Sequence, residues 1–305
     1  MTAIQQAQRR LQDALPGRVE LDWPLASHTT YGIGGPADLA LFPADVQQVA
    51  VAVRLLRELG LPWVVLGGGS NVLVSDHGVR GAVLCTSGLD RLAAEGQRVT
   101  AGAGVDSHQV ARQAQRTGLT GAEFLTWLPG SIGGACLMNA RAYGGEVSQV
   151  LRRAVTVDRR GAVAALELTA EQFAYKRSPF AADGLLVVEV TLELAPGDPG
   201  QIQQQMDRIE RLRRANHEMA FPSCGCVFKN DYDIGISSGR VIDQCGLKGF
   251  TVGRARVSPY HANFVINTGG ATAADVRAVI DHVQREVTAA TGHTLELEVQ
   301  LLGEW

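Results

Sequence analysis

The chain has 305 residues, of which 46% are hydrophobic and 19% charged, and its formal net charge is −3. This balance is typical of a globular protein with a proper core, and the length suits two or three domains. The charge disfavours nonspecific binding to nucleic acid, which needs a basic surface. The longest basic cluster, residues 208–214, contains an acid within a helical pattern, so we interpret it as a solvated helix face.

The N-terminus, the hydropathy and the cysteines predict a cytosolic protein without metal. Residues 1–15 lack the apolar core of a secretory signal, and no run of about 18 apolar residues suggests a membrane span. The cysteines are odd in number and contain no C-x-x-C pair, which favours neither a disulfide framework nor a zinc site. They are Cys85, Cys136, Cys224, Cys226 and Cys245.

The first part of the chain predicts a strand–helix–strand unit. After a helix over 2–15 come a short strand over 37–43 and an amphipathic helix over 44–59. Asp45 lies near the start of that helix and Gly60 stops it. Residues 62–67, PWVVLG, read as a buried strand. Such a unit is expected in an α/β or α+β fold.

The rest of the chain alternates short strands with helices. A Pro/Gly break after a strand pattern places a domain boundary near 195–200, and Gly292 stops the last helix. We predict strands over 81–87, 91–96, 98–104, 185–197 and 294–303, the last with alternating polarity, and helices over 107–119, 200–217 and 273–292.

Glycine is the unusual residue, with 35 copies gathered mainly in loops. LGGGSNVLVSD (66–76), TTYGIGGPADL (29–39) and the five-glycine segment 128–147 each lie between apolar stretches. Such loops expose backbone N–H groups with no Cβ in the way, which suits a pyrophosphate. None matches the P-loop or the Rossmann fingerprint. Three such loops favour one extended ligand, such as a dinucleotide; three unrelated turns are the alternative.

The stretch FPSCGCVFKN (221–230) places two thiols on either side of Gly225. Closely spaced thiols suggest a metal site, a disulfide or a nucleophile. None of these fits this chain well on spacing alone, so the stretch needs its wider context.

Seven segments follow one another along the chain: TTYGIGGPAD, LGGGSNVLVSD, GAEFLTWLPGSIGGACLMNARAYGGEV, YKRSPF, CGCVFKN, VIDQCGLKGFTVGRARVSPYHANFVIN and LELEVQLLG. In this order they resemble the UDP-N-acetylenolpyruvoylglucosamine reductase family, and the resemblance runs from about Thr29 to Gly303. The space between YKRSPF and the strand near 185 is too short for the extra loop of some members, so the chain resembles the shorter, type II form.

This resemblance implies an α+β protein with a vanillyl-alcohol-oxidase (PCMH-type) FAD-binding fold of two subdomains and an α+β substrate-binding domain. The implied boundaries are 1–80 for the first FAD subdomain, 81–197 for the second and 198–293 for the UDP-sugar domain. The last strand, within 294–305, returns to the first subdomain.

The implied activity is an FAD-dependent dehydrogenase of peptidoglycan precursor synthesis. NADPH reduces noncovalently bound FAD, and hydride passes from flavin N5 to C3 of UDP-N-acetylglucosamine enolpyruvate, giving UDP-N-acetylmuramate. The implied partners are small molecules, with no nucleic acid and no membrane, and a monomer or weak dimer is expected in the cytoplasm.

Three residues match the family's catalytic positions. Arg177, in YKRSPF, is expected to bind the substrate carboxylate and stabilise the enolate. Glu298 is expected to assist charge stabilisation or proton delivery, although it also fits the polar face of a strand. Cys226 stands where many members have serine and is expected to protonate C2, since a thiol is a better acid than an alcohol. Cys224 is interpreted as small apolar filler.

Other positions are carried over as binding residues. The expected substrate contacts are Tyr175, Lys229, Asn230, His261 and Asn263, with His261 nearer to a structural role. The expected FAD contacts are Tyr31, Gly32, Ile33, Gly34, Gly35, Leu66, Gly67, Gly68, Gly69, Ser70, Asn71, Pro129, Gly130, Ser131, Gly133, Gly134, Asn139, Tyr143, Gly144 and Gly145.

Two residues depart from the family pattern near the expected FAD: Arg141 replaces a glycine and Trp127 a small residue. Two other functions stay open. An oxidase of the same flavin fold would need a different substrate domain. A non-enzymatic UDP-sugar or nucleotide-binding module would keep the glycine loops without Arg177 and the acid.

Overall fold

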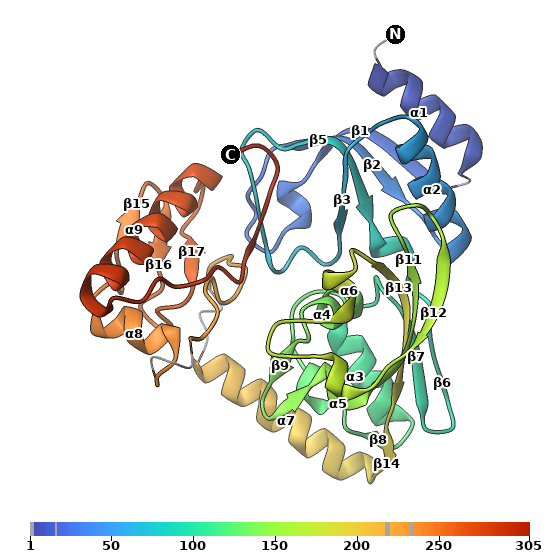
Figure 1. The fold of residues 1–305 in the computed structure, drawn as a ribbon. Helices are drawn as coiled ribbons and strands as arrows, with labels where there is room; N and C mark the ends of the chain where they lie inside the picture. The colour runs from blue at the N-terminus through green and yellow to red at the C-terminus, as the bar shows by residue number, and fades with distance from the viewer. Residues whose placement is uncertain (1–2, 16, 217–219, 232–234) are drawn as a thin grey trace. The chain divides into compact units, whose positions relative to one another are not determined.

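A computed structural model describes residues 3–15, 17–216, 220–231 and 235–305 and divides the chain into two compact units (Figure 1). Unit 1 comprises residues 1–22, 38–68 and 81–213, and unit 2 comprises residues 23–37, 69–80 and 214–305. The chain therefore passes between the units several times. The division of the flavin-binding part into two subdomains stays a prediction.

A four-stranded sheet, lying mostly in unit 1, contains the predicted strand–helix–strand unit. Its order is β1-β2-β5-β3, and β3 runs parallel to β5. Helix α2 (Val46–Glu58) begins at Asp45, whose carboxylate accepts a hydrogen bond from Gln48 N at 2.8 Å. The strands are β1 (Arg18–Pro24), β2 (Pro36–Phe42), β3 (Trp63–Leu66) and β5 (Val79–Cys85), and the first helix is α1 (Ala3–Ala14).

The prediction of a buried strand over 62–67 is wrong about burial. Strand β3 is at the sheet edge, Val65 is 38% exposed, and Leu66 is its only buried residue. An apolar run does not distinguish a central strand from an edge strand whose outer side is open.

Unit 1 also contains a five-stranded antiparallel sheet in the order β12-β11-β13-β7-β6. Helices α3 (Ser107–Arg116) and α4 (Ile132–Leu137) pack on it (Figure 1). The sequence prediction missed β11, which contains bulges, and β12, whose residues are largely exposed, because neither alternates regularly. The strands are β6 (Leu92–Glu95), β7 (Arg98–Gly102), β11 (Leu151–Val157), β12 (Val163–Glu167) and β13 (Leu186–Glu193).

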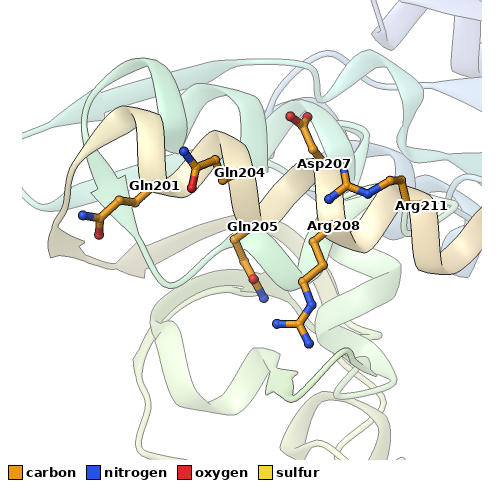
Figure 2. A pocket seen from close by; sticks show the side chains of 6 residues that line it. All are labelled: Gln201, Gln204, Gln205, Asp207, Arg208 and Arg211. Carbon is orange, nitrogen blue, oxygen red and sulfur yellow. The ribbon is translucent and has the colours of Figure 1, made fainter.

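The longest helix of unit 1, α7 (Pro199–Asn216), begins within the predicted boundary; residue 217 of that prediction lies outside the described residues. Figure 2 shows a hollow lined by polar side chains of α7 alone, none of them a predicted site residue. The remaining short elements are β8 (Leu119–Thr120), β9 (Arg141–Ala142), β10 (Gly145–Glu146), α5 (Val147–Val150), α6 (Pro179–Ala182), β14 (Ala195–Pro196), and the 3₁₀ turns Ala26–His28, Thr86–Gly88, Glu123–Leu125 and Ala170–Gln172.

Unit 2 is built on a three-stranded antiparallel sheet covered by α9 (Figure 1). Helix α9 (Ala273–Thr291) ends, as predicted, at Gly292, which has φ +76. A separate parallel pair joins β4 (Val72–Val74) to the C-terminal β18 (Gln300–Leu302). The sheet strands are β15 (Thr251–Val252), β16 (Ala255–Val257) and β17 (Val265–Asn267), and the other helix is α8 (Ser238–Gln244).

The predicted strand over 294–303 is wrong for its first half, because regular strand covers only Gln300–Leu302. Upstream of it, Leu297 forms an isolated bridge with Phe228, and Glu298 N donates to Val227 O at 2.8 Å. The alternating side chains reflect these single pairings rather than a ladder. Among the described residues, no helix has the length and apolarity to cross a bilayer.

Asp76 joins the second glycine loop to the start of α9. Its two carboxylate oxygens accept hydrogen bonds from Ala273 N at 2.8 Å and Ala274 N at 2.9 Å. A carboxylate at a helix N-terminus satisfies amides that have no partner within the helix. We expect Asp76→Ala to lower the free energy of unfolding by about 1 kcal/mol in urea titrations.

A matched control lies on the same helix. Asp281 forms an i,i+4 ion pair with Arg277, with its side chain 40% exposed. We expect Asp281→Ala to change stability by less than about 0.5 kcal/mol. Equal effects of the two substitutions would contradict the capping role of Asp76.

Candidate functional site

In unit 1, two of the predicted glycine loops lie backbone to backbone. A Cβ on Gly68 would lie 2.5 Å from Gly130 Cα and 2.8 Å from Ser131 N, so only glycine fits. The carbonyl of Gly130 accepts hydrogen bonds from both N and Oγ of Ser107, each at 3.0 Å. Ser131 Oγ accepts from Gly134 N and caps α4. The loops at 66–68 and 129–134 therefore form one fixed surface.

Two buried threonine hydroxyls of unit 1 have no hydrogen-bond partner among the described residues. They are Thr86 Oγ1 and Thr126 Oγ1, and the first lies 3.9 Å from where a Cβ on Gly67 would stand. A buried hydroxyl without a partner is costly, and a polar ligand would satisfy it. These hydroxyls and the glycine surface suit the polar atoms of a flavin nucleotide.

Neither threonine was among the predicted site residues. A signal existed for Thr86, which directly follows β5, as the glycine loop follows β3. Because these strands are parallel neighbours, their carboxyl ends lie at the same sheet edge. Ligands in open α/β sheets bind beyond that edge. We found no comparable signal for Thr126.

The third loop continues into a segment with several left-handed residues. Asn139 has φ +42, Tyr143 φ +49 and Gly144 φ +88. The Tyr143 hydroxyl is a further buried group without a partner among the described residues. Gly145 lies against Phe124, which a Cβ would approach to 2.6 Å. Flavin contacts of these residues stay predictions.

Arg177 and Tyr175 lie on one tight turn of unit 1. Ala174 and Arg177 pair their backbones, with N–O distances of 3.1 and 3.0 Å. Tyr175 and Lys176 form the turn between them, and the Lys176 ammonium lies 5.8 Å from the Tyr175 ring centroid. Arg177 itself is exposed. The turn thus presents a guanidinium at the surface of unit 1.

In unit 2, the first glycine loop packs against the end of β4 and the residues that follow it. A Cβ on Gly34 would lie 2.6 Å from Val74 Cβ, and one on Gly35 would lie 2.3 Å from Asp76 O. Gly69 has φ +64, and a Cβ there would similarly clash with His28 O. The nearby predicted residues Gly32 and Ile33 belong to this packed loop, and Ile33 is 3% exposed.

Asn71 connects the second glycine loop to the segment before β18 that carries Glu298. Its Nδ2 donates to Glu298 O, and its carbonyl accepts from Gln300 N, both at 3.0 Å. The loop that the sequence assigns to flavin therefore holds the backbone of a predicted catalytic residue.

Cys226 and Glu298 lie on neighbouring backbone segments of unit 2. Cys226 forms an antiparallel bridge with Phe264, and the next carbonyl, Val227 O, accepts from Glu298 N at 2.8 Å. Cys226 is partly exposed. The structure thus brings together two of the three residues predicted to be catalytic.

Cys224 differs from Cys226 in its surroundings. It is 3% exposed, and burial raises the pKa of its thiol to about 12, although a hydrogen bond with Tyr31 opposes this shift. Its neighbour Tyr31 is fully buried, and burial raises the pKa of that hydroxyl well above its ordinary value. Cys224 is therefore a neutral core residue, in agreement with its interpretation as filler.

Three of the predicted substrate residues of unit 2 make polar contacts with other residues of that unit. Lys229 forms an ion pair with Glu296, and Asn230 Oδ1 accepts from Ser238 N at 3.0 Å near the start of α8. Asn263 pairs with the backbone of Phe228 through both Oδ1 and Nδ2, at 2.9 and 2.8 Å. These contacts leave substrate binding by the three residues as a prediction.

His261 is held beside the Cys226 segment. Its ring lies 4.8 Å from that of Phe264, and Nδ1 accepts from Asn263 N at 3.3 Å. Burial lowers the pKa of His261. A neutral imidazole packed at a tilt against Phe264 fits the structural interpretation of this residue.

The two departures from the family pattern both lie in unit 1. Trp127 is 37% exposed and has φ +55, and its backbone N–H donates to His108 Nδ1 at 3.3 Å. Arg141 is exposed on β9, and its charge contributes to lowering the pKa of Glu146.

Two parts of the chain match known protein families. Residues 37–167 match an FAD binding domain, and residues 217–302 match the UDP-N-acetylenolpyruvoylglucosamine reductase C-terminal domain. The fold and these matches define an FAD-dependent oxidoreductase, as the family resemblance implied.

The particular family follows from full-length relatives. The UDP-N-acetylenolpyruvoylglucosamine reductase of Heliobacterium modesticaldum is 42% identical over 92% of this chain and 90% of its own length. That of Pediococcus pentosaceus is 41% identical over 96% and 98%. The crystal structure of the Thermus caldophilus enzyme superposes with a TM-score of 0.78 at 33% identity, covering 94% of this chain and 98% of that one. The chain belongs to the UDP-N-acetylenolpyruvoylglucosamine reductase family.

Proposed function

We propose that this chain reduces UDP-N-acetylglucosamine enolpyruvate to UDP-N-acetylmuramate, a peptidoglycan precursor, with NADPH as the electron source. The observation that carries the proposal is the placement of Cys226 beside Glu298, joined through the Glu298 N–Val227 O hydrogen bond. Reduction of an enolpyruvyl double bond needs a proton donor, and a thiol with a carboxylate-bearing residue on the neighbouring segment supports that role.

The residues that would hold FAD are those of the glycine loops together with Thr86 and Thr126. Unit 1 contributes the surface made by Gly67, Gly68 and residues 129–134. No covalent bond is needed, because closely packed backbone and buried hydroxyls supply polar contacts to a nucleotide. FAD held by these residues would supply the hydride for the reduction.

The remaining chemistry belongs to side chains of this chain. Hydride addition at C3 develops negative charge at C2, beside a carboxylate, so the site must stabilise that charge and deliver a proton. Arg177 is suited to bind the carboxylate through its guanidinium fork. Cys226 transfers its thiol proton to C2, and the thiolate regains a proton from solvent. Glu298 assists proton delivery beside Cys226.

The test is NADPH consumption by purified protein loaded with FAD. We expect loss of NADPH absorbance only when UDP-N-acetylglucosamine enolpyruvate is added, with UDP-N-acetylmuramate as the product. Oxygen consumption without that substrate would instead support an oxidase of the same fold. Absence of flavin absorbance after reconstitution would support a binding module and overturn the proposal.

A further inference from the structure

The turn that carries Arg177 has a conformation that its own sequence does not favour. Lys176, at the tip, has φ +55, a left-handed conformation that a non-glycine side chain disfavours. Such a residue persists only where the surrounding structure holds it. The groups that bind the two ends of the turn therefore decide where Arg177 lies.

One end of the turn is held by Asn139. Its Nδ2 donates to Ala174 O at 3.1 Å and to Glu146 Oε1 at 2.9 Å, while its Oδ1 accepts from Ser148 N at 3.0 Å. Asn139 is 2% exposed. Both amide hydrogens are thus used inside unit 1, and one of them reaches the residue whose backbone pairs with Arg177.

Glu146 fixes the orientation of the Asn139 amide. The same oxygen, Oε1, also accepts from Ser148 Oγ at 2.6 Å. The hydrogen bonds from Ser148 and Asn139, with the charge of Arg141, lower the pKa of Glu146. An ionised carboxylate accepts only, so it keeps the Nδ2 side of the amide toward Glu146 and Ala174.

The other end of the turn is held from the same segment. Ser178 Oγ donates to Leu137 O at 2.7 Å and accepts from Ala181 N at the start of α6. Leu137 is the last residue of α4, and Asn139 lies two residues further along the chain. Residues 137 and 139 therefore form hydrogen bonds with the two ends of the Arg177 turn.

We infer that Asn139, oriented by Glu146, is a positioning residue that sets the place of the Arg177 guanidinium relative to the glycine surface of unit 1. The inference rests on the proposed function, because it assumes that Arg177 binds the substrate carboxylate. It gives Asn139 a role separate from the flavin contact predicted from the resemblance.

The test is a double-mutant comparison of Asn139→Asp and Arg177→Ala. Asn139→Asp keeps the shape of the side chain but replaces the donor by an acceptor facing Ala174 O and Glu146. Flavin reoxidation by UDP-N-acetylglucosamine enolpyruvate is followed by anaerobic stopped flow, with flavin content and melting temperature measured in parallel. Gln149→Ala is the matched control, because it removes a hydrogen bond to Glu146 N without touching the turn.

We expect Asn139→Asp to slow reoxidation about 10- to 100-fold, because a small misplacement of a binding group has such effects. In the Arg177→Ala background the same substitution should change the rate by no more than about 2-fold. Gln149→Ala should retain the parent rate.

The outcomes separate the inference from the proposed function. If Arg177→Ala leaves reoxidation unchanged, the proposed role of Arg177 fails, and the inference fails with it. If Arg177→Ala is slow but Asn139→Asp slows both backgrounds equally, or releases flavin, only the inference is overturned. If Asn139→Asp does not fold, Ser148→Ala, which removes one bond to Glu146, must show the same non-additivity with a smaller effect.

Discussion

Cys226→Ala should slow flavin reoxidation by UDP-N-acetylglucosamine enolpyruvate by about 10²- to 10⁴-fold, the usual contribution of a general acid. Flavin reduction by NADPH should keep the parent rate, because that step uses no proton from Cys226. Cys226→Ser should retain substantial activity, since a hydroxyl can occupy the same place and donate a proton. Anaerobic stopped flow at the flavin bands measures both half-reactions separately.

The neighbouring thiol provides the matched control. Cys224 is two residues away, but it is buried, and its thiol pKa is raised to about 12. A buried neutral thiol beside Tyr31 has no access to substrate, so Cys224→Ala should leave both half-reactions within about 2-fold while removing a small core contact. Equal reoxidation rates in Cys226→Ala and the parent protein would remove Cys226 from the mechanism.

The helices were predictable because their signals are local. For α2 and α9, Asp45 and Gly292 lie at the predicted ends, and the apolar spacing between them follows one helix face. The strands were harder, because burial depends on neighbours distant in sequence. The outer edge of β3 and the single pairings before β18 are tertiary facts that a window of residues does not contain.

The site shows the same contrast between features with a local sequence signal and contacts between residues distant in sequence. The packing of Gly68 against Gly130 follows from glycines that the sequence already singled out. By contrast, the Ala174 carbonyl that Asn139 binds lies 35 residues away in the sequence, and the Glu298 carbonyl that Asn71 binds lies 227 residues away. Their type suggests a polar contact but not its target, so the resemblance assigned both to the flavin. The structure shows that each asparagine side chain binds the backbone of a segment with a predicted catalytic residue.

Gly68→Ala should weaken FAD binding about 10- to 100-fold, the second large effect that we expect. The new Cβ would lie 2.5 Å from Gly130 Cα and 2.8 Å from Ser131 N, so two backbones would have to separate. Overpacking of this kind costs about 1–3 kcal/mol, which corresponds to the stated loss of affinity if the strain falls on the bound state. Titration of apoprotein with FAD, followed by flavin fluorescence, measures the dissociation constant.

Two further alanines calibrate this result. Gly67→Ala would meet Ser131 Oγ, a side-chain atom that can move, so its effect should be smaller than that of Gly68→Ala. Gly200→Ala, on α7, would approach only Asp198 Oδ1 at 3.1 Å, and it should leave FAD affinity unchanged. A graded loss in the order 68, 67, 200 would locate the flavin at the surface between the two loops. Parent-like affinity in Gly68→Ala, with unchanged melting temperature, would mean that FAD does not depend on this surface.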